Sequence, residues 1–168
     1  MRTIKTVATI FSYMSLLFGL TGFIGPLVRG NRDKTFNTKP GLQFGFAATN
    51  WIHSLAHTLF GAVGLVPAVR DRYARQYVSS LTGIFAALAG MGWMTTRNRD
   101  GIHMRMGMAI NRADNIIHTV WAAIGLFFAL QPNFFENLPS QRQMRQTLEH
   151  TRSRVEEKIQ PQREKMPV

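Results

Sequence analysis

Two histidines occupy matching positions in a pair of similar apolar segments, and their side chains could bind a metal ion or a tetrapyrrole. His57 opens segment 57–65, and His118 opens segment 118–126, which shares its His-Thr and Gly-Leu pairs. Neutral imidazole is a good axial ligand for haem iron, and it also binds chlorophyll magnesium or a transition metal. We therefore predict a tandem duplication that pairs His57 and His118 as cofactor ligands, with haem or chlorophyll as the candidate cofactor.

A second interpretation assigns the same histidines to helix packing. Hydrogen bonds between membrane helices contribute on average about 0.6 kcal/mol each. The partners expected for such bonds are Ser54, Thr58, Asn115 and Thr119. His53 has no counterpart in the second segment, where Asp114 takes its place. We expect His53 to be a hydrogen-bonding group at a helix end, and both interpretations of His57 and His118 stay open.

The residues around these histidines form a polar stripe on each of two predicted helices. At 100° per residue, polar and small side chains share one face, and apolar side chains cover the others. This inverted pattern is typical of a membrane helix that packs its polar side inward. The stripe contains Asn50, His53, Ser54, His57, Gly61 and Gly64 in the first helix, and Asn115, His118, Thr119 and Gly125 in the second.

Four apolar blocks without Asp, Glu, Lys or Arg are predicted to position these residues. They cover about 7–28, 44–69, 77–95 and 115–130. At 1.5 Å per residue they are about 24–39 Å long, against a hydrocarbon core of about 30 Å. The fourth block is short, and we expect its helix to extend into 112–114 or 134–135. The predicted fold is all-α, an integral membrane four-helix bundle of two parallel helix-hairpin repeats.

The predicted domains are a four-span membrane domain at 1–135 and a soluble tail at 136–168. Repeat 1 covers about 4–69 and repeat 2 about 76–130. Segment 29–43 is predicted to be an exposed loop, and 96–114 an interfacial segment on the membrane surface. Apolar residues of the tail recur at helical spacing and predict a basic amphipathic helix; they are Met144, Leu148, Thr151, Val155 and Ile159.

Glycines on the first helix of each hairpin predict close approach of a neighbouring helix. Gly19, Gly22 and Gly25 follow one another at three-residue steps in the first block. The third block contains Gly83, Gly90 and Gly92, and the pair Gly92-Trp93 resembles Gly22-Phe23. Such small-residue strips let helix backbones approach closely in membranes.

Charge and missing motifs exclude several classes of function. The net charge of +11 lies outside the apolar blocks, so anionic lipid headgroups are expected partners and nucleic acid is not. The chain has no cysteine, and it lacks phosphate-binding loops, zinc-protease motifs and nucleophile elbows. We predict no enzyme activity, no catalytic residue and no dedicated metal motif. The absence of a carboxylate within the blocks also disfavours ion-coupled transport.

Segment 103–108 suggests a separate copper hypothesis. Its sequence, His-Met-Arg-Met-Gly-Met, combines an imidazole with three thioethers, which are ligands suited to Cu(I). Alternate spacing would place the methionines on one side only in an extended segment. Methionine is also an ordinary apolar residue for an interfacial loop.

The pattern Asn50-x-x-His53-x-x-x-His57-x-x-x-Gly61, with Asn115-x-x-His118 later, resembles a family of small four-span bacterial membrane proteins. That family is a domain of unknown function, so the resemblance implies an integral membrane protein but no activity. We expect a multi-pass protein of the bacterial inner membrane or thylakoid. The expected role is a structural or accessory subunit that binds other membrane subunits or itself, in a bioenergetic or photosynthetic complex. The alternatives are a haem- or chlorophyll-binding protein and a small uncoupled channel or facilitator.

Overall fold

The computed structural model describes residues 2–97, 100–130, 145–146 and 148–154. The chain divides into two units, Met1–Pro132 and Asn133–Val168. In the second unit the described residues 145–146 and 148–154 are helical. The predicted tail positions Met144, Val155 and Ile159 lie outside the described residues.

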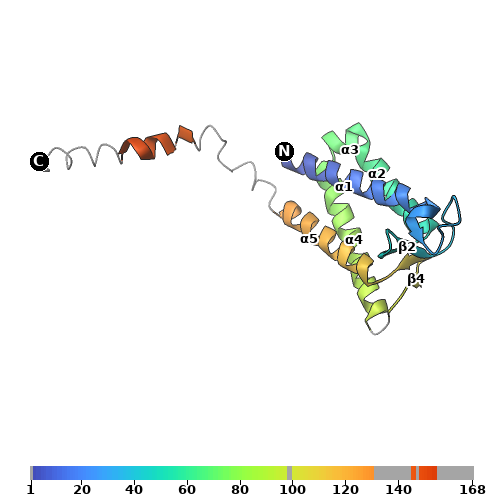
Figure 1. Cartoon of the computed structure of the whole chain (residues 1–168). Coiled ribbons are helices and arrows are strands. Elements are labelled where there is room, and N and C mark those ends of the chain that lie inside the picture. The colour runs from blue at the N-terminus through green and yellow to red at the C-terminus, as the bar shows by residue number, and fades with distance from the viewer. Residues whose placement is uncertain (1, 98–99, 131–144, 147, 155–168) are drawn as a thin grey trace, which may run out of the picture. The chain divides into compact units, whose positions relative to one another are not determined.

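The first unit contains long helices joined by short β hairpins (Figure 1). Helix α1 packs mainly against α2, and α4 packs mainly against α5, while α1 also touches α4. The helices are α1 (Arg2–Gly22), η1 (Gly25–Leu27), α2 (Trp51–Leu65), α3 (Pro67–Asp71), α4 (Ala74–Thr96) and α5 (Arg112–Leu130). The fold is therefore mostly helical, and an order of helix, antiparallel strands and helix occurs twice in the described chain.

Small antiparallel sheets correct the all-α prediction. One sheet has the strand order β1–β2–β3, and the other pairs β4 with β5. The strands are β1 (Val28–Arg29), β2 (Gly41–Gln43), β3 (Ala47–Thr49), β4 (His103–Arg105) and β5 (Met108–Ile110). The segments predicted as an exposed loop at 29–43 and as a membrane-surface segment at 96–114 are more ordered than expected, and the membrane-surface location stays a prediction. Both segments contain strands, and Gln43 is buried.

A tight turn folds the second hairpin. Arg105 pairs with Met108 across it, and the two residues between them have positive φ, 48° at Met106 and 76° at Gly107. This is the combination that a two-residue type I′ turn requires, and glycine adopts it without a steric cost.

Three described helices are long and apolar enough to cross a membrane: 3–22 in α1, Ala74–Thr96 and Arg112–Leu130. The predicted second span is wrong in its extent, because α2 has only 15 residues, about 22 Å. Asn50 caps α2 at its start. At its end Val66 has ψ 127°, since a residue before proline is driven to extended backbone, here by Pro67.

The helix of the fourth apolar block begins before that block, as expected, because the block alone is short for a membrane span. Helix α5 starts at Arg112 and therefore includes Asp114, whose side chain is buried. The prediction that no carboxylate lies within a span is consequently wrong for this helix. A buried carboxylate within a candidate span removes the reason to disfavour ion-coupled transport.

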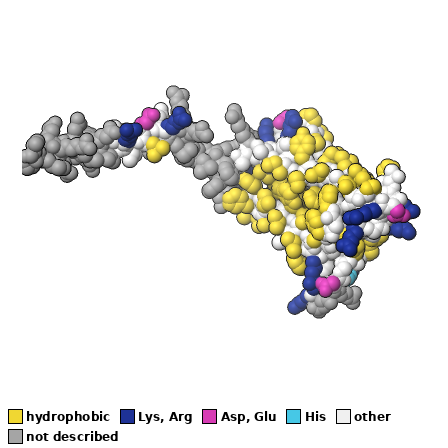
Figure 2. All heavy atoms as spheres, viewed as in Figure 1, with side chains coloured by type: hydrophobic (Ala, Val, Ile, Leu, Met, Phe, Trp, Pro, Cys, Tyr) yellow, Lys and Arg dark blue, Asp and Glu magenta, His cyan; other side chains and the backbone are white. Residues whose placement is uncertain are grey.

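The core lies where α1 and α4 meet. Its buried side chains include Val7, Phe11, Val78, Leu81 and Phe85. Apolar side chains also cover much of the visible outer face of the first unit, and charged side chains gather at its ends (Figure 2). This distribution is the one expected of helices in contact with lipid.

Several glycines sit where a neighbouring side chain leaves no room for a Cβ. A Cβ at Gly22 would meet Ser54 Oγ, and one at Gly92 would meet Asn115 Oδ1. The two contacts correspond, because Ser54 and Asn115 stand at the same spacing before His57 and His118. Gly83 and Gly90, in contrast, face open space, and the prediction of close approach is wrong for them.

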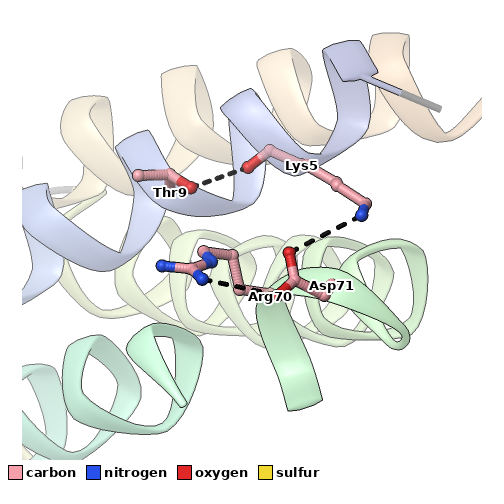
Figure 3. Close-up of polar contacts among 4 residues, drawn as sticks. All are labelled: Lys5, Thr9, Arg70 and Asp71. Atoms are coloured by element: carbon pink, nitrogen blue, oxygen red, sulfur yellow. Dashed lines mark hydrogen bonds and ion pairs between the residues drawn. The ribbon is translucent and has the colours of Figure 1, made fainter. Parts of the chain in front are cut away.

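An ion pair joins the start of α1 to α3 (Figure 3). Lys5 Nζ lies 3.6 Å from Asp71 Oδ1, and Arg70 Nη2 lies 3.4 Å from Asp71 Oδ2. The hydrogen bond from Arg70 and the charges of Arg70 and Lys5 lower the pKa of Asp71. The pair places the N-terminal end of α1 beside the turn that precedes α4.

Candidate functional site

Three histidines converge in the centre of the first unit. His53 and His57 come from α2, and His118 comes from α5. One ring nitrogen from each lies within 4.8 Å of the others. The ring centroids of His57 and His118 are 5.9 Å apart and the rings are nearly parallel, at 11°. The sequence prediction that His57 and His118 are neighbours agrees with this geometry.

Helix geometry and two caps set the positions of these rings. His53 and His57 are four residues apart, so they share one face of α2. Asn50 Oδ1 accepts a hydrogen bond from His53 N at 3.1 Å, which fixes the first turn of α2. Asn111 Oδ1 accepts from Asp114 N at 3.0 Å, and Asp114 Oδ2 accepts from Asn111 N at 3.0 Å. This reciprocal capping box fixes the start of α5 one turn before His118.

The ring of His53 is held by the other half of the unit. Its Nδ1 lies 2.9 Å from the carbonyl oxygen of Ala109 in β5. A carbonyl only accepts, so Nδ1 carries the proton and Nε2 carries the lone pair of the neutral ring. A histidine ligand is commonly fixed in this way, through a hydrogen bond from its other nitrogen to a backbone carbonyl. His53 is thus a helix-end hydrogen-bonding group, as expected, and also a member of the cluster.

One ring nitrogen of His57, the buried Nδ1, has no hydrogen-bond partner among the described residues. The ring stacks near Phe85, with centroids 6.1 Å apart, and Phe85 also stacks on His118 at 5.5 Å. A buried polar atom without a partner is costly and calls for an explanation, for which a bound ion is one candidate.

The packing interpretation receives no direct support from the hydrogen bonds. Within the described part of the chain, none links His57 or His118 to the four expected partners. Those partners bond elsewhere: Ser54 Oγ with Thr49 Oγ1, Thr58 to Ser54 O, Asn115 to Thr96, and Thr119 to Asn115 O.

A single metal ion fits the cluster better than a tetrapyrrole does. The cavity beside the histidines has a volume of about 20 Å³, whereas small-molecule pockets usually have about 300–1,000 Å³. Haem or chlorophyll would require the helices to separate. A Zn–N bond is about 2.0–2.1 Å, so tetrahedral donors lie roughly 3.4 Å apart. Side-chain closure by roughly 1–1.5 Å would therefore bring the three nitrogens to bonding distance.

The other members of the polar stripe are distributed as follows. Asn50, Ser54 and Asn115 are buried, and Gly61, Gly64 and Gly125 lie at helix contacts. Thr119 is exposed and accepts a hydrogen bond from Trp93 Nε1, so it lies away from the cluster.

Three residues around the cavity were not predicted. Gln43 enters from β2 and donates to Phe18 O at 2.9 Å and Thr21 Oγ1 at 2.7 Å. Asp114 and Phe85 also line the cavity. The position of Asp114 could have been found from its equivalence to His53, whereas nothing in the loop sequence indicated Gln43.

The structure separates the ligands of the copper hypothesis. Because the chain turns at Met106 and Gly107, Met104 lies opposite Ala109, while Met108 lies opposite Arg105. Neighbouring pairs in a ladder point to opposite faces, so Met104 and Met108 do not share a side. Residues 103–108 do not form one continuous extended run, because the chain reverses at Met106 and Gly107 between β4 and β5.

Apolar helices of membrane-spanning length, arranged around a buried polar centre, define a protein of the membrane-helix class. A family model described as "Domain of unknown function (DUF4383)" matches residues 5–131. The chain belongs to this family, which confirms the predicted membership in a family of unknown function. No curated protein and no solved structure matches the chain.

Proposed function

We propose that this chain is a non-enzymatic integral membrane protein that holds one transition-metal ion at His53, His57 and His118. The observation that carries the proposal is the convergence of three ring nitrogens within 4.8 Å. Imidazole suits Zn²⁺, copper, iron and nickel, and three histidines with an open fourth position form a known zinc geometry. The buried, unpartnered Nδ1 of His57 supports the same conclusion.

The two halves of the unit both contribute to the proposed site. His53 and His57 precede the α3–α4 region, and His118 follows it. The matching glycine contacts of Ser54 and Asn115 support an internal duplication into two parallel helix-hairpin repeats. A metal ion in this place would link the repeats at their centre.

Metal content of the detergent-purified protein tests the proposal, with Zn²⁺ as the probe. After Zn²⁺ loading and dialysis, elemental analysis should give one ion per chain. Loss of a group that only orients a ligand costs roughly 10–100-fold in metal affinity, so His57→Gln and His118→Gln should each lose more than about 100-fold. His150→Gln, in the second unit, is the matched control and should keep the ion. Equal Zn²⁺ content in all four proteins would overturn the proposal.

A role as an accessory subunit of a membrane complex is proposed together with this site. Helix α1 carries an outward apolar stripe at three- and four-residue spacing, formed by Ile10, Tyr13, Leu17 and Leu20, each about half exposed. Such a stripe suits contact with lipid or another membrane helix. The bacterial inner membrane and the thylakoid are the proposed locations. Purification in mild detergent should retain a partner subunit or a second copy, and a strictly monomeric protein counts against this role.

The facilitator hypothesis gains nothing from the structure. The cavity at the polar centre, at about 20 Å³, has room for about one water molecule. The stripe that would line a path instead packs against neighbouring helices at Gly61 and Gly64.

A further inference from the structure

An open pocket lies where α4 ends and α5 begins, away from the histidines. Its volume is about 610 Å³, and it is lined by Trp93, Met94, Thr96, Arg97 and Arg112. Three of these residues belong to α4, Arg97 is its C-terminal cap, and Arg112 is the first residue of α5. Because α4 and α5 are both candidate spans, the pocket is at one end of two membrane helices, the level at which lipid headgroups lie.

Two guanidinium groups give the pocket its charge. Arginine presents several N–H donors in a planar fork that matches phosphate oxygens. Arg112 Nη1 lies 3.0 Å from Asp100 Oδ1, but the Asp100 side chain is 86% exposed. Such a solvated pair is weak and is easily exchanged for another anion. No such ion pair is found for Arg97 among the described residues, so both cations can serve an anionic ligand.

The other wall is apolar. Met94 is 83% exposed and Trp93 is 41% exposed, although both belong to a helix of membrane-spanning length. Trp93 Nε1 donates to Thr119 Oγ1 at 3.0 Å, which fastens the indole across α4 and α5. Tryptophan at the end of a membrane helix commonly sits among lipid headgroups, with its ring toward the acyl chains.

We infer that this pocket binds one anionic phospholipid. Arg97 and Arg112 contact the headgroup phosphate, and the acyl chain follows Trp93 and Met94. Free phosphate shares the charge, but it would use only a small part of about 610 Å³ and none of the apolar wall. The volume lies in the range of about 300–1,000 Å³ that is usual for organic ligands.

Titration of the detergent-solubilised full chain with three probes tests this inference, with thermal stability and native mass spectrometry as readouts. The probes are phosphatidylglycerol, phosphatidylcholine with the same acyl chains, and inorganic phosphate. Phosphatidylglycerol should raise the melting temperature and remain bound in the mass spectrum, and the other two should do neither. Equal effects of the two lipids, or an equal effect of inorganic phosphate, would overturn the lipid assignment.

Variants locate the site. Arg97→Gln with Arg112→Gln should weaken phosphatidylglycerol binding roughly 30-fold, the loss expected for two basic groups near a membrane surface. Arg29→Gln with Arg32→Gln, at the end of β1 and shortly after it in the first half, is the matched control and should bind as the wild type does. Met94→Gln changes a side chain outside the core, so it keeps the fold, and it should weaken binding several-fold. Equal losses in the control pair, or no loss in Met94→Gln, would refute the pocket.

Discussion

Asn50 and Asn111 make reciprocal contacts between the two halves of the helical unit. The side-chain amide of Asn50 donates to Gly107 O at 2.7 Å, and that of Asn111 donates to Phe46 O at 2.7 Å. Asn111 takes in the second half the position of Asn50 in the first, and Gly107 corresponds in the same way to Phe46. Each asparagine also caps its own helix through Oδ1. One side chain therefore starts a helix and holds the turn of the opposite hairpin.

Replacement of either asparagine should destabilise the protein more than loss of a cap alone. An Asn→Ala change at an N-cap costs about 0.5–2 kcal/mol, and the bond to the opposite turn adds about 1 kcal/mol. Serine keeps the cap but is too short to reach the opposite turn. In detergent, the melting temperature should fall in the order wild type, Asn50→Ser, Asn50→Ala. Equal stability of the wild type and the serine variant would show that the contact with Gly107 contributes nothing.

The closeness of particular residues from the two halves could be predicted from sequence because their residue types recur. His57 with His118, and Gly22 with Gly92, keep their types or their spacing, and the structure places each at a corresponding contact. The hairpins could not be predicted, because strands of two or three residues are too short to show a period of two.

Two residues of the candidate site, His53 as a cluster member and Gln43, could not be predicted from local sequence patterns. His53 has no equivalent histidine in the second half, where Asp114 takes its place. For this reason His53 was not predicted to join His57 and His118 as a ligand. The third histidine of the cluster is positioned by tertiary contact alone, because Ala109 O, distant in the chain, orients the ring of His53. Gln43 was hidden because a polar residue in a polar loop gives no sign that it is buried.

Glycines of the helices should respond to alanine according to what faces them. A Cβ at Gly61 would lie 2.5 Å from Leu16 N and 2.7 Å from Ser12 O, which are backbone atoms that cannot move aside. Gly61→Ala should therefore cost about 1–3 kcal/mol through overpacking. Gly83→Ala and Gly90→Ala meet no atom within 4 Å and should gain up to about 1 kcal/mol from helix propensity. Thermal unfolding in one detergent measures all three, and a loss at Gly83 comparable to that at Gly61 would contradict the packing.

The ion pair of Asp71 should make stability depend on pH in the acid range. Arg70 and Lys5 hold the pKa of Asp71 below its ordinary value of 3.8, so the unfolded chain binds a proton more readily than the folded one does. The stabilisation is therefore present above about pH 4 and is lost as pH falls through the lower folded value. The melting temperatures of wild type and Asp71→Asn should differ slightly at pH 7, and the difference should shrink as pH falls below about 4. A difference that stays constant from about pH 7 down to about pH 2 would assign the effect to something other than this carboxylate.

A metal ion that joins residues from both halves should compensate for a weakened contact between them. Binding to the folded state alone stabilises by RT ln(1 + [L]/Kd), about 2.7 kcal/mol at a hundredfold excess over Kd. This gain is similar to the loss expected for Asn50→Ala, so Zn²⁺ should return that variant to near the melting temperature of the metal-free wild type. Asn50→Ala combined with His118→Gln should show no such rescue, because its second half supplies no ligand. Equal rescue of both variants would mean that Zn²⁺ stabilises the protein from another place.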